Sequence, residues 1–433
     1  MKRAALYTLG CKVNQYETQA IAELFERAGY LIADFDEAAD VYVINTCTVT
    51  GMSDRKSRQI LRRAKRHNPN AVTVVTGCYA QTAPEEVSAI DGVDLVVGTQ
   101  GRTRIVEMVE ALSQGGAHCC VSDIMHTHEF EDLSVSGYGE RTRAYIKVQE
   151  GCNQFCSYCI IPYARGPVRS RDVDDVITEA KRLAAAGFCE VVLTGIHIAS
   201  YGRDLAGGQE LTDLIGCVAE VEGIRRIRLS SIEPMTLDGA FLDAVRDCGK
   251  LCDHFHLSLQ SGCDDTLRRM NRRYSTADYR GIIDGLRVAF PGAAITTDVM
   301  VGFPGENEGE FAESLAFVES VGFADLHVFA YSPRKGTKAA GMPEQVSPED
   351  KHRRSEVMIA AGEKSRAAFL DQHVGLESRV LFEREVEGQS GVYEGKTTNY
   401  ITVRCKSDTG LTGQMRQVHL QGHDGTVMEG EVK

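Results

Sequence analysis

The 433-residue sequence lacks any run of about 18 consecutive apolar residues, so no segment resembles a membrane-spanning helix. The residues after Met1 are strand-like and do not form the apolar start of a signal peptide. We therefore expect a cytoplasmic protein with no membrane partner. Basic residues are not in excess either: the net charge of −13 argues against a nucleic acid held by overall charge. A local basic patch can still contact phosphates.

Length and cysteine content narrow the possibilities further. A chain of 433 residues is too long for one ordinary hydrophobic core, so several domains are expected. Fourteen cysteines are present. In a cytosolic chain they indicate metal or redox chemistry more than a disulfide framework.

The first hundred residues alternate between strand and helix patterns. A helix is predicted over Gln15–Ala28, with Asn14 as its N-cap and Gly29 just after its end. Such alternation predicts an open parallel sheet with helices on its faces. The expected strands are Ala4–Leu9, Val41–Asn45, Val72–Thr76 and Leu95–Gly98.

From Arg143 the alternation resumes with six further strand patterns, separated by helices such as Val173–Ala186, Asp238–Arg246 and Glu308–Val321. For the last of these helices, Asn307 is the expected N-cap. Six strand–helix units predict a partial (β/α)6 barrel with its active groups at the carboxyl ends of the strands. The expected strands are Tyr145–Gln149, Val191–Thr194, Ile227–Ser230, His254–Leu259, Ile295–Val301 and Leu326–Ala330.

After a polar helix around Pro348–His373, short alternating strands predict a small β-barrel. Its expected strands include Glu377–Glu385, Gly391–Lys396 and Tyr400–Cys405. The chain is therefore expected to be an α/β multidomain protein. We predict an N-terminal cluster domain over residues 1–115, a linker over 116–140 with Gly115 and Gly116 at its start, a barrel over 141–370 and a C-terminal β-barrel over 371–433.

Three cysteines, Cys152, Cys156 and Cys159, lie within eight residues directly after the first barrel strand. Their spacing differs from the two-plus-two pattern of a zinc finger. Three thiolates suit a 4Fe–4S cluster with one iron free of protein ligands, and an open iron can bind a substrate or cofactor. A zinc site or three buried thiols are the alternatives.

A second set of cysteines follows three strands of the first domain: Cys11, Cys47 and Cys78. In an open parallel sheet, groups beyond the carboxyl ends of the strands converge on one edge. The three thiols therefore suit a second iron–sulfur cluster. Three unrelated buried cysteines are the alternative.

The spacing Cys152-x3-Cys156-x2-Cys159 resembles the signature of radical S-adenosylmethionine (SAM) enzymes, and the set Cys11, Cys47 and Cys78 resembles the additional cluster domain of the methylthiotransferases. The resemblance extends over the whole chain and includes a TRAM-like C-terminal barrel. The opening Thr8-Leu-Gly-Cys11-Lys-Val-Asn14 looks most like the branch acting on N6-threonylcarbamoyladenosine in tRNA. Other motifs that carry the resemblance are Ile161-Pro-Tyr-Ala-Arg165-Gly, Ser230-Ser231-Ile-Glu233-Pro234 and Gly302-Phe-Pro304-Gly305-Glu306.

The resemblance implies a tRNA-modifying enzyme that inserts a methylthio group at C2 of the modified adenosine at position 37, next to the anticodon. The cofactors it implies are a pair of 4Fe–4S clusters and SAM. SAM would act both as radical source and as methyl donor. An external electron donor is implied as a partner. Radical chemistry suits this reaction because an aromatic carbon carries no acidic proton and no leaving group.

Several polar residues are candidates for SAM binding. Thr194 and Gly195 end one barrel strand, and Ser230, Ser231 and Glu233 follow another. Arg171 suits a carboxylate because its guanidinium can donate two parallel hydrogen bonds.

For RNA, the strongest local signal is a basic helix shortly after Cys47, with phosphate contacts as its expected role. Its basic residues are Arg55, Lys56, Arg58, Arg62, Arg63, Lys65 and Arg66. Arg165, Arg169 and Arg171 are expected to form a second basic group near the first cluster.

Two alternatives remain at this stage. The substrate could instead be isopentenyladenosine in tRNA or an aspartate of a ribosomal protein. A chain of another class, a non-catalytic iron–sulfur sensor or electron carrier, would need no substrate cavity.

Overall fold

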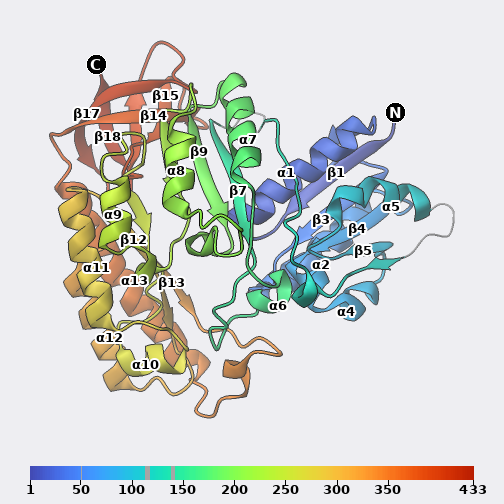
Figure 1. Ribbon diagram of the computed structural model, residues 1–433, viewed down its shortest axis with the longest axis horizontal. Coiled ribbons are helices and arrows are strands. Elements are labelled where there is room, and N and C mark those ends of the chain that lie inside the picture. Colours follow the sequence, from blue (N-terminus) through green and yellow to red (C-terminus); the bar gives the residue numbers. More distant parts are fainter. Residues whose placement is uncertain (50, 113–117, 138–141) are drawn as a thin grey trace.

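The computed structural model describes residues 1–49, 51–112, 118–137 and 142–433. The chain forms three parts (Figure 1): an N-terminal sheet with its helices, a central part of strands and helices, and a C-terminal barrel. The N-terminal sheet and the C-terminal barrel contact different sides of the central part. Among the described residues, no helix has the length and apolar composition needed to cross a membrane.

The N-terminal sheet has six parallel strands in the order β2-β1-β3-β4-β5-β6. The four predicted strands correspond to β1, β3, β4 and β5, whereas the short edge strands β2 and β6 were not predicted. The strands are β1 (Arg3–Thr8), β2 (Leu31–Ala33), β3 (Val41–Thr46), β4 (Val72–Gly77), β5 (Leu95–Val97) and β6 (Cys119–Cys120). The helices are α1 (Lys12–Arg27), α2 (Gly51–His67), α3 (Cys78–Thr82), α4 (Pro84–Ser88) and α5 (Ile105–Leu112).

Helix α1 begins earlier than predicted. Cys11 has extended backbone angles and is the N-cap, so Asn14 lies inside the helix and the predicted cap was wrong. The Asn14 amide instead donates to the carbonyl oxygens of Leu9 (2.7 Å) and Thr46 (3.0 Å). These bonds join the loop after β1 to the end of β3. They also satisfy the two donors of the buried amide, which would otherwise lack hydrogen-bond partners.

Part of the predicted linker belongs to the folded units. Cys119 and Cys120 form β6 of the N-terminal sheet, and Leu133 and Val135 are buried in the core of the central part. Residues within the predicted linker therefore contact both neighbouring parts of the chain. Residues 113–117 and 138–141, which include Gly115 and Gly116, lie outside the described residues.

The central part contains the six predicted strands, paired in parallel as β7–β9–β10 and β11–β12–β13. Isolated parallel bridges, Ile227 to Leu251 and Ile232 to Leu257, connect the two sets. The strands are β7 (Arg143–Glu150), β9 (Glu190–Gly195), β10 (Arg226–Leu229), β11 (His254–His256), β12 (Ala294–Val301) and β13 (Asp325–Ala330), with β8 (Arg169–Ser170) antiparallel at one edge. The helices are α6 (Ile161–Arg165), α7 (Val173–Ala185), α8 (Leu211–Ala219), α9 (Gly239–Val245), α10 (Asp264–Arg269), α11 (Thr276–Ala289), α12 (Glu308–Val321) and α13 (Pro348–Asp371).

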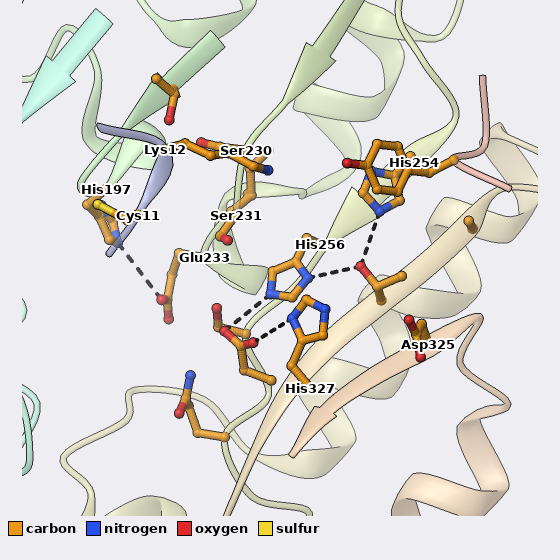
Figure 2. A pocket seen from close by; sticks show the side chains of 18 of the residues that line it. Cys11, Lys12, His197, Ser230, Ser231, Glu233, His254, His256, Asp325 and His327 are labelled. Atoms are coloured by element: carbon orange, nitrogen blue, oxygen red, sulfur yellow. Dashed lines mark hydrogen bonds and ion pairs between the residues drawn. The ribbon is translucent and has the colours of Figure 1, made fainter. Parts of the chain in front are cut away.

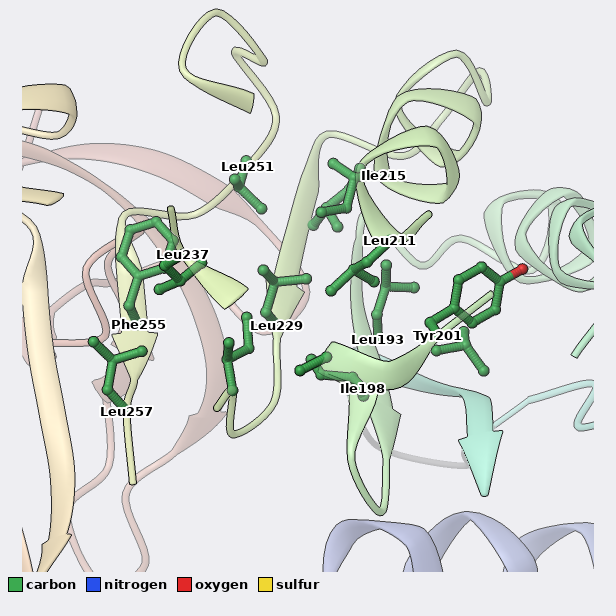
Figure 3. Close-up of a cluster of buried hydrophobic side chains, with 14 of the residues drawn as sticks. Leu193, Ile198, Tyr201, Leu211, Ile215, Leu229, Leu237, Leu251, Phe255 and Leu257 are labelled. Carbon is green, nitrogen blue, oxygen red and sulfur yellow. The ribbon is translucent and has the colours of Figure 1, made fainter. Parts of the chain in front are cut away.

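Apolar side chains of these strands and helices form one continuous core (Figure 3). Leu193 of β9 and Leu229 of β10 lie in this cluster with Leu211 and Ile215 of α8. Each large buried aliphatic side chain stabilises the fold by about 1.5–3 kcal/mol. Helix α12 has the predicted bounds, and Asn307 caps it by accepting from the Glu310 N–H.

The C-terminal part is a closed five-stranded barrel in the order β14-β15-β16-β18-β17. It attaches to the central part through β10, whose buried Arg226 and Arg228 donate to carbonyl oxygens of the barrel. Arg228 reaches Thr398 at 2.8 Å and Thr397 at 3.2 Å. Its strands are β14 (Glu377–Glu385), β15 (Val392–Lys396), β16 (Thr402–Lys406), β17 (Met415–His423) and β18 (Met428–Val432).

Candidate active site

A cavity of about 960 Å³ lies where the three parts of the chain meet. Gly10, Cys11 and Lys12 line it from the N-terminal part, and Lys396 and Tyr400 line it from the C-terminal barrel. Figure 2 shows side chains from several strands projecting into this space. Much of the remaining lining comes from residues that follow strands of the central part, among them Cys152, Cys156, Cys159, Ser258 and Gln260.

The loop with Cys152, Cys156 and Cys159 directly follows β7. Its path depends on Gly151, whose φ is +73° and whose added Cβ would lie 1.7 Å from the Pro167 carbonyl oxygen. Burial raises the pKa of Cys152 to about 11 and that of Cys159 to about 12. All three thiols face one cavity, so they can serve as ligands to one metal cluster.

Five of the six residues predicted to bind SAM line this cavity: Thr194, Gly195, Ser230, Ser231 and Glu233. Gly195 has no room for a side chain, since an added Cβ would lie 2.9 Å from the Gln149 carbonyl oxygen. Three cavity-lining residues carry a buried polar atom without a hydrogen-bond partner among the described residues, as expected where a polar ligand binds. These atoms are Ser230 Oγ, His254 Nδ1 and Gln260 Oε1.

Glu233 contacts a residue that the sequence analysis missed, Arg272. The two side chains pair at 2.9 Å, and a second guanidinium nitrogen of Arg272 lies 3.5 Å from Cys156 Sγ. Burial alone would raise the pKa of Glu233, but His197 and Arg272 lower it below its usual value. Arg272 therefore links the cysteine loop to the proposed SAM pocket. It lies in a loop between α10 and α11, and its sequence context carries no signal for this position.

Arg171 does not line the cavity. Its guanidinium pairs with Glu179 and with Asp132 at 2.9 Å, and only 3% of its side chain is exposed. The structure therefore gives Arg171 a structural ion pair, and the predicted contact with the SAM carboxylate was wrong. The predicted second basic group for RNA was also wrong, because Arg165 and Arg169 are fully buried as well.

Cys11, Cys47 and Cys78 follow β1, β3 and β4, so the parallel sheet brings their loops to one edge. An added Cβ on Gly10 would lie 2.7 Å from Cys47 Cβ, so the loop after β1 requires glycine there. Burial raises the pKa of Cys47 to about 11, and the neighbouring Cys78 and Cys11 thiols add to the rise. The three thiols are therefore close enough to influence one another.

A buried ionic network lies beside Cys78. Arg165 donates from Nε to Cys78 Sγ at 3.2 Å and pairs with Glu17 of α1. Arg102 and Arg165 hold the pKa of Glu17 well below its usual value, although burial alone would raise it. Four cations face three carboxylates, and this excess of positive charge favours an anionic ligand set at Cys78. The members are Glu17, Arg102, Glu131, Lys147, Glu150, Arg165 and Arg169.

A second polar cluster in the cavity was also missed: His256, Asp298 and His327. One Asp298 oxygen lies 3.2 Å from His256 Nε2, and the other lies 3.3 Å from His327 Nδ1. The three ligand atoms lie within 4.8 Å of one another, so they could hold a divalent metal ion. The sequence could have indicated this cluster, because the three residues lie on three consecutive predicted strands that pair in parallel. The Asp298 carboxylate raises the pKa of His327.

The basic helix predicted for RNA binding is α2. Arg55, Lys56, Arg62 and Arg66 are exposed. The other three basic residues pair with acidic residues of the same part: Arg58 with Glu86, Arg63 with Asp36 and Lys65 with Asp94. Four of the seven predicted residues thus remain available to a phosphate backbone.

Comparisons with known proteins agree with this arrangement. Residues 3–98 match the family described as "Uncharacterized protein family UPF0004", and residues 146–318 match the radical SAM superfamily. The threonylcarbamoyladenosine tRNA methylthiotransferase MtaB of Bacillus subtilis is 43% identical over 97% of this chain and 94% of its own. The MtaB protein of Thermotoga maritima is 36% identical over 93% and 91%. The tRNA-2-methylthio-N(6)-dimethylallyladenosine synthase of Pelotomaculum thermopropionicum is 33% identical over 98% and 96%.

Solved structures share the fold at lower identity. The radical SAM methyltransferase TsrM of Kitasatospora setae has a TM-score of 0.58 and 16% identity, covering 78% of this chain and 77% of its own. Membership of the radical SAM superfamily implies SAM and a 4Fe–4S cluster as cofactors. On the whole-length similarity to the tRNA methylthiotransferases, this chain belongs to the radical SAM methylthiotransferase family.

Proposed function

We propose that this protein inserts a methylthio group at C2 of N6-threonylcarbamoyladenosine at position 37 of tRNA, next to the anticodon. One observation carries the proposal: the cavity is lined both by Cys152, Cys156 and Cys159 and by Cys11 of the second cysteine set. A substrate in this cavity would contact both sets at once. The MtaB relatives, which act on threonylcarbamoyladenosine by name, support this substrate.

The chemistry needs groups that the two cysteine sets suit. A 4Fe–4S cluster with SAM supplies a radical able to remove hydrogen from an unactivated carbon, and we propose an auxiliary cluster as the site of the sulfur. Cys152, Cys156 and Cys159 would hold the first cluster, and Cys11, Cys47 and Cys78 the second. The cation of Arg272 beside Cys156 and that of Arg165 beside Cys78 suit two anionic centres.

The proposed SAM contacts follow from the cavity lining. The unpartnered Ser230 hydroxyl can hydrogen-bond a polar group of SAM, and Ser231 lies beside it. Glu233, held by Arg272, can accept from an ammonium or ribose hydroxyl. Thr194 and Gly195 border the same space at the end of β9.

For the RNA, we propose that the exposed residues of α2 contact phosphates: Arg55, Lys56, Arg62 and Arg66. The C-terminal barrel would act as a TRAM-like domain that closes the cavity over the anticodon stem-loop. An external electron donor is the further partner. We propose the domain limits 1–115, 141–370 and 371–433, with a linker over residues 116–140, and six strand–helix units in the central barrel.

Nucleoside analysis tests the substrate. Reconstituted protein with SAM, a reductant and tRNA bearing threonylcarbamoyladenosine is expected to yield its 2-methylthio derivative and 5′-deoxyadenosine. The control is tRNA bearing isopentenyladenosine, which the dimethylallyladenosine synthases would use. Methylthiolation of that control alone would overturn the proposal, and SAM cleavage without either product would favour a different reaction.

A further inference from the structure

Two lysines, Lys12 and Lys396, line the cavity from the N-terminal part and from the C-terminal barrel. Lys12 is the first residue of α1 and directly follows Cys11, and Lys396 ends β15. The Lys396 ammonium donates to the Thr402 hydroxyl. In the part of the chain that the structure describes, neither lysine forms an ion pair with an acidic side chain.

The acidic side chains of the same cavity are all paired, as far as the described residues show. Glu233 pairs with Arg272, Asp298 with His256 and His327, and Asp325 with Arg366. The two lysines are therefore a local excess of positive charge. Half-buried ammonium groups without a counter-ion are unfavourable, so an anionic ligand is expected to bind them.

Tyr400 lies beside these cations and gives the site its shape. The Lys396 ammonium lies 4.6 Å from the Tyr400 ring centroid, and the ring stacks on His254 at 4.6 Å with an angle of 13°. Tyr400 has a left-handed φ of +71°, a costly conformation for tyrosine that the surrounding contacts must maintain. Arg143 and Arg228 also face the ring, but each already pairs with a glutamate.

The positive charge acts on the phenol itself. Burial alone would raise the pKa of Tyr400, yet Arg143, Lys12 and Lys396 lower it below its usual value. This end of the cavity therefore favours negative charge.

We infer that Lys12 and Lys396 together bind the carboxylate of the threonyl group that the substrate carries on N6. The inference rests on the proposed function and extends it to substrate selection. In adenine, C2 and C6 flank the ring nitrogen N1 and N6 is bonded to C6, so a group on N6 can extend along the N1 edge toward C2. Lys12 adjoins Cys11, the side from which sulfur would reach C2. An isopentenyl group carries no charge and would gain nothing from two ammonium groups.

The anion could also be a phosphate of the RNA backbone, and binding measurements separate the two sources. Full-length protein with reconstituted clusters would be titrated with three anticodon stem-loops. One carries threonylcarbamoyladenosine, one carries its threoninamide analogue and one carries isopentenyladenosine. The variants are Lys12→Gln, Lys396→Gln and the charge-preserving Lys396→Arg. Lys406→Gln on the exposed side of β16 is the matched control, and iron content is measured for each.

Lys12→Gln and Lys396→Gln are each expected to weaken binding of the carboxylate-bearing RNA about tenfold, the effect of one lost charge-assisted hydrogen bond. Binding of the amide and isopentenyl RNAs should stay unchanged, and Lys396→Arg and Lys406→Gln should behave as the parent. Equal weakening for all three RNAs would assign the lysines to phosphate and overturn the inference, as would no weakening. If the parent protein fails to methylthiolate threonylcarbamoyladenosine, the proposed function fails independently of these binding results.

Discussion

The two cysteine sets of this protein are built in opposite ways. Cys152, Cys156 and Cys159 occupy one short loop after β7, and all three face the cavity. Cys11, Cys47 and Cys78 come from three separate strand ends; Cys47 and Cys78 are buried, and Cys78 lies beside an ionic network. The first set depends on a local turn, whereas the second requires the whole N-terminal sheet to form.

Because of this difference, we expect changes elsewhere in the chain to affect the two cysteine sets unequally. A local loop can keep its ligands together even if distant parts shift. A convergent set also depends on the contact between two domains, because Arg165 of α6 reaches across to Cys78 and Glu17. We therefore expect the second site to be the more sensitive one to changes elsewhere in the chain.

The strongest test of this comparison is removal of one cysteine from each set. Cys152→Ala is expected to abolish SAM cleavage, because the proposed SAM-binding cluster would lose a ligand. Cys47→Ala should leave cleavage measurable while the methylthio product disappears. 5′-Deoxyadenosine and the modified nucleoside would be measured together by mass spectrometry.

Cys119→Ala, at an exposed position of β6, is the matched control and should retain both activities and the iron content. Loss of SAM cleavage to the same extent in Cys152→Ala and Cys47→Ala, with folding intact, would contradict separate roles for the two sets.

The next largest effect is expected for Arg165→Ala, which removes a fully buried cation from beside Glu17 and Cys78. Removing one member of a buried ion pair typically costs about 3–5 kcal/mol of folding free energy, and because Glu17 keeps its ion pair with Arg102, we expect the lower end of this range. Denaturant unfolding of the metal-free protein measures this loss. Arg246→Ala, in an exposed pair with Asp243, should cost no more than about 1 kcal/mol. Similar stability of the two variants would show that the network contributes little.

A smaller effect is expected on the alkylation rates of the thiols, which compare the two cysteine sets directly. Burial raises the pKa of both Cys47 and Cys152 to about 11. At pH 8 roughly one thiol in a thousand is then ionised, against about one in four for an ordinary cysteine. In metal-free protein, alkylation by iodoacetamide should be about 250-fold slower than for a free cysteine and should rise about tenfold per pH unit up to pH 10.

The same shift affects stability. The folded-state pKa lies above the unfolded value, so the thiols favour the folded state in their neutral form. The metal-free protein should therefore lose stability as the pH rises above about 9.

Fast alkylation of Cys47 at pH 7 would contradict the predicted alkylation rate and would show that the loop with Cys47 opens in the absence of metal.

The smallest expected effect concerns the exposed basic residues of α2, which we propose to contact RNA phosphates. Arg62→Ala on α2 should weaken tRNA binding several-fold and lower the slope of log affinity against log salt by about 1. Arg63→Ala on the same helix is the control, because Arg63 already pairs with Asp36. Filter binding at several salt concentrations measures both. An unchanged slope for Arg62→Ala would exclude α2 from the phosphate contacts.

The sequence alone determined the features that depend on neighbouring residues. Capping chemistry and local periodicity predicted the bounds of α12 and its Asn307 cap. The same periodicity predicted most strands along the chain, and the three cysteines Cys152, Cys156 and Cys159 could be read directly from their spacing. Local interactions act over a few residues, so they can be recognised in a linear pattern.

Only the tertiary structure decided which distant charges meet. Arg171 was equally suited to a ligand carboxylate or to a protein carboxylate, and packing against α7 placed Glu179 beside it. Arg272 reached the cysteine loop, and Lys12 and Lys396 of two different parts came to line one cavity, without any signal in their surroundings. Long side chains pair with whatever charge the folded chain brings near, and that depends on the packing of all three parts at once.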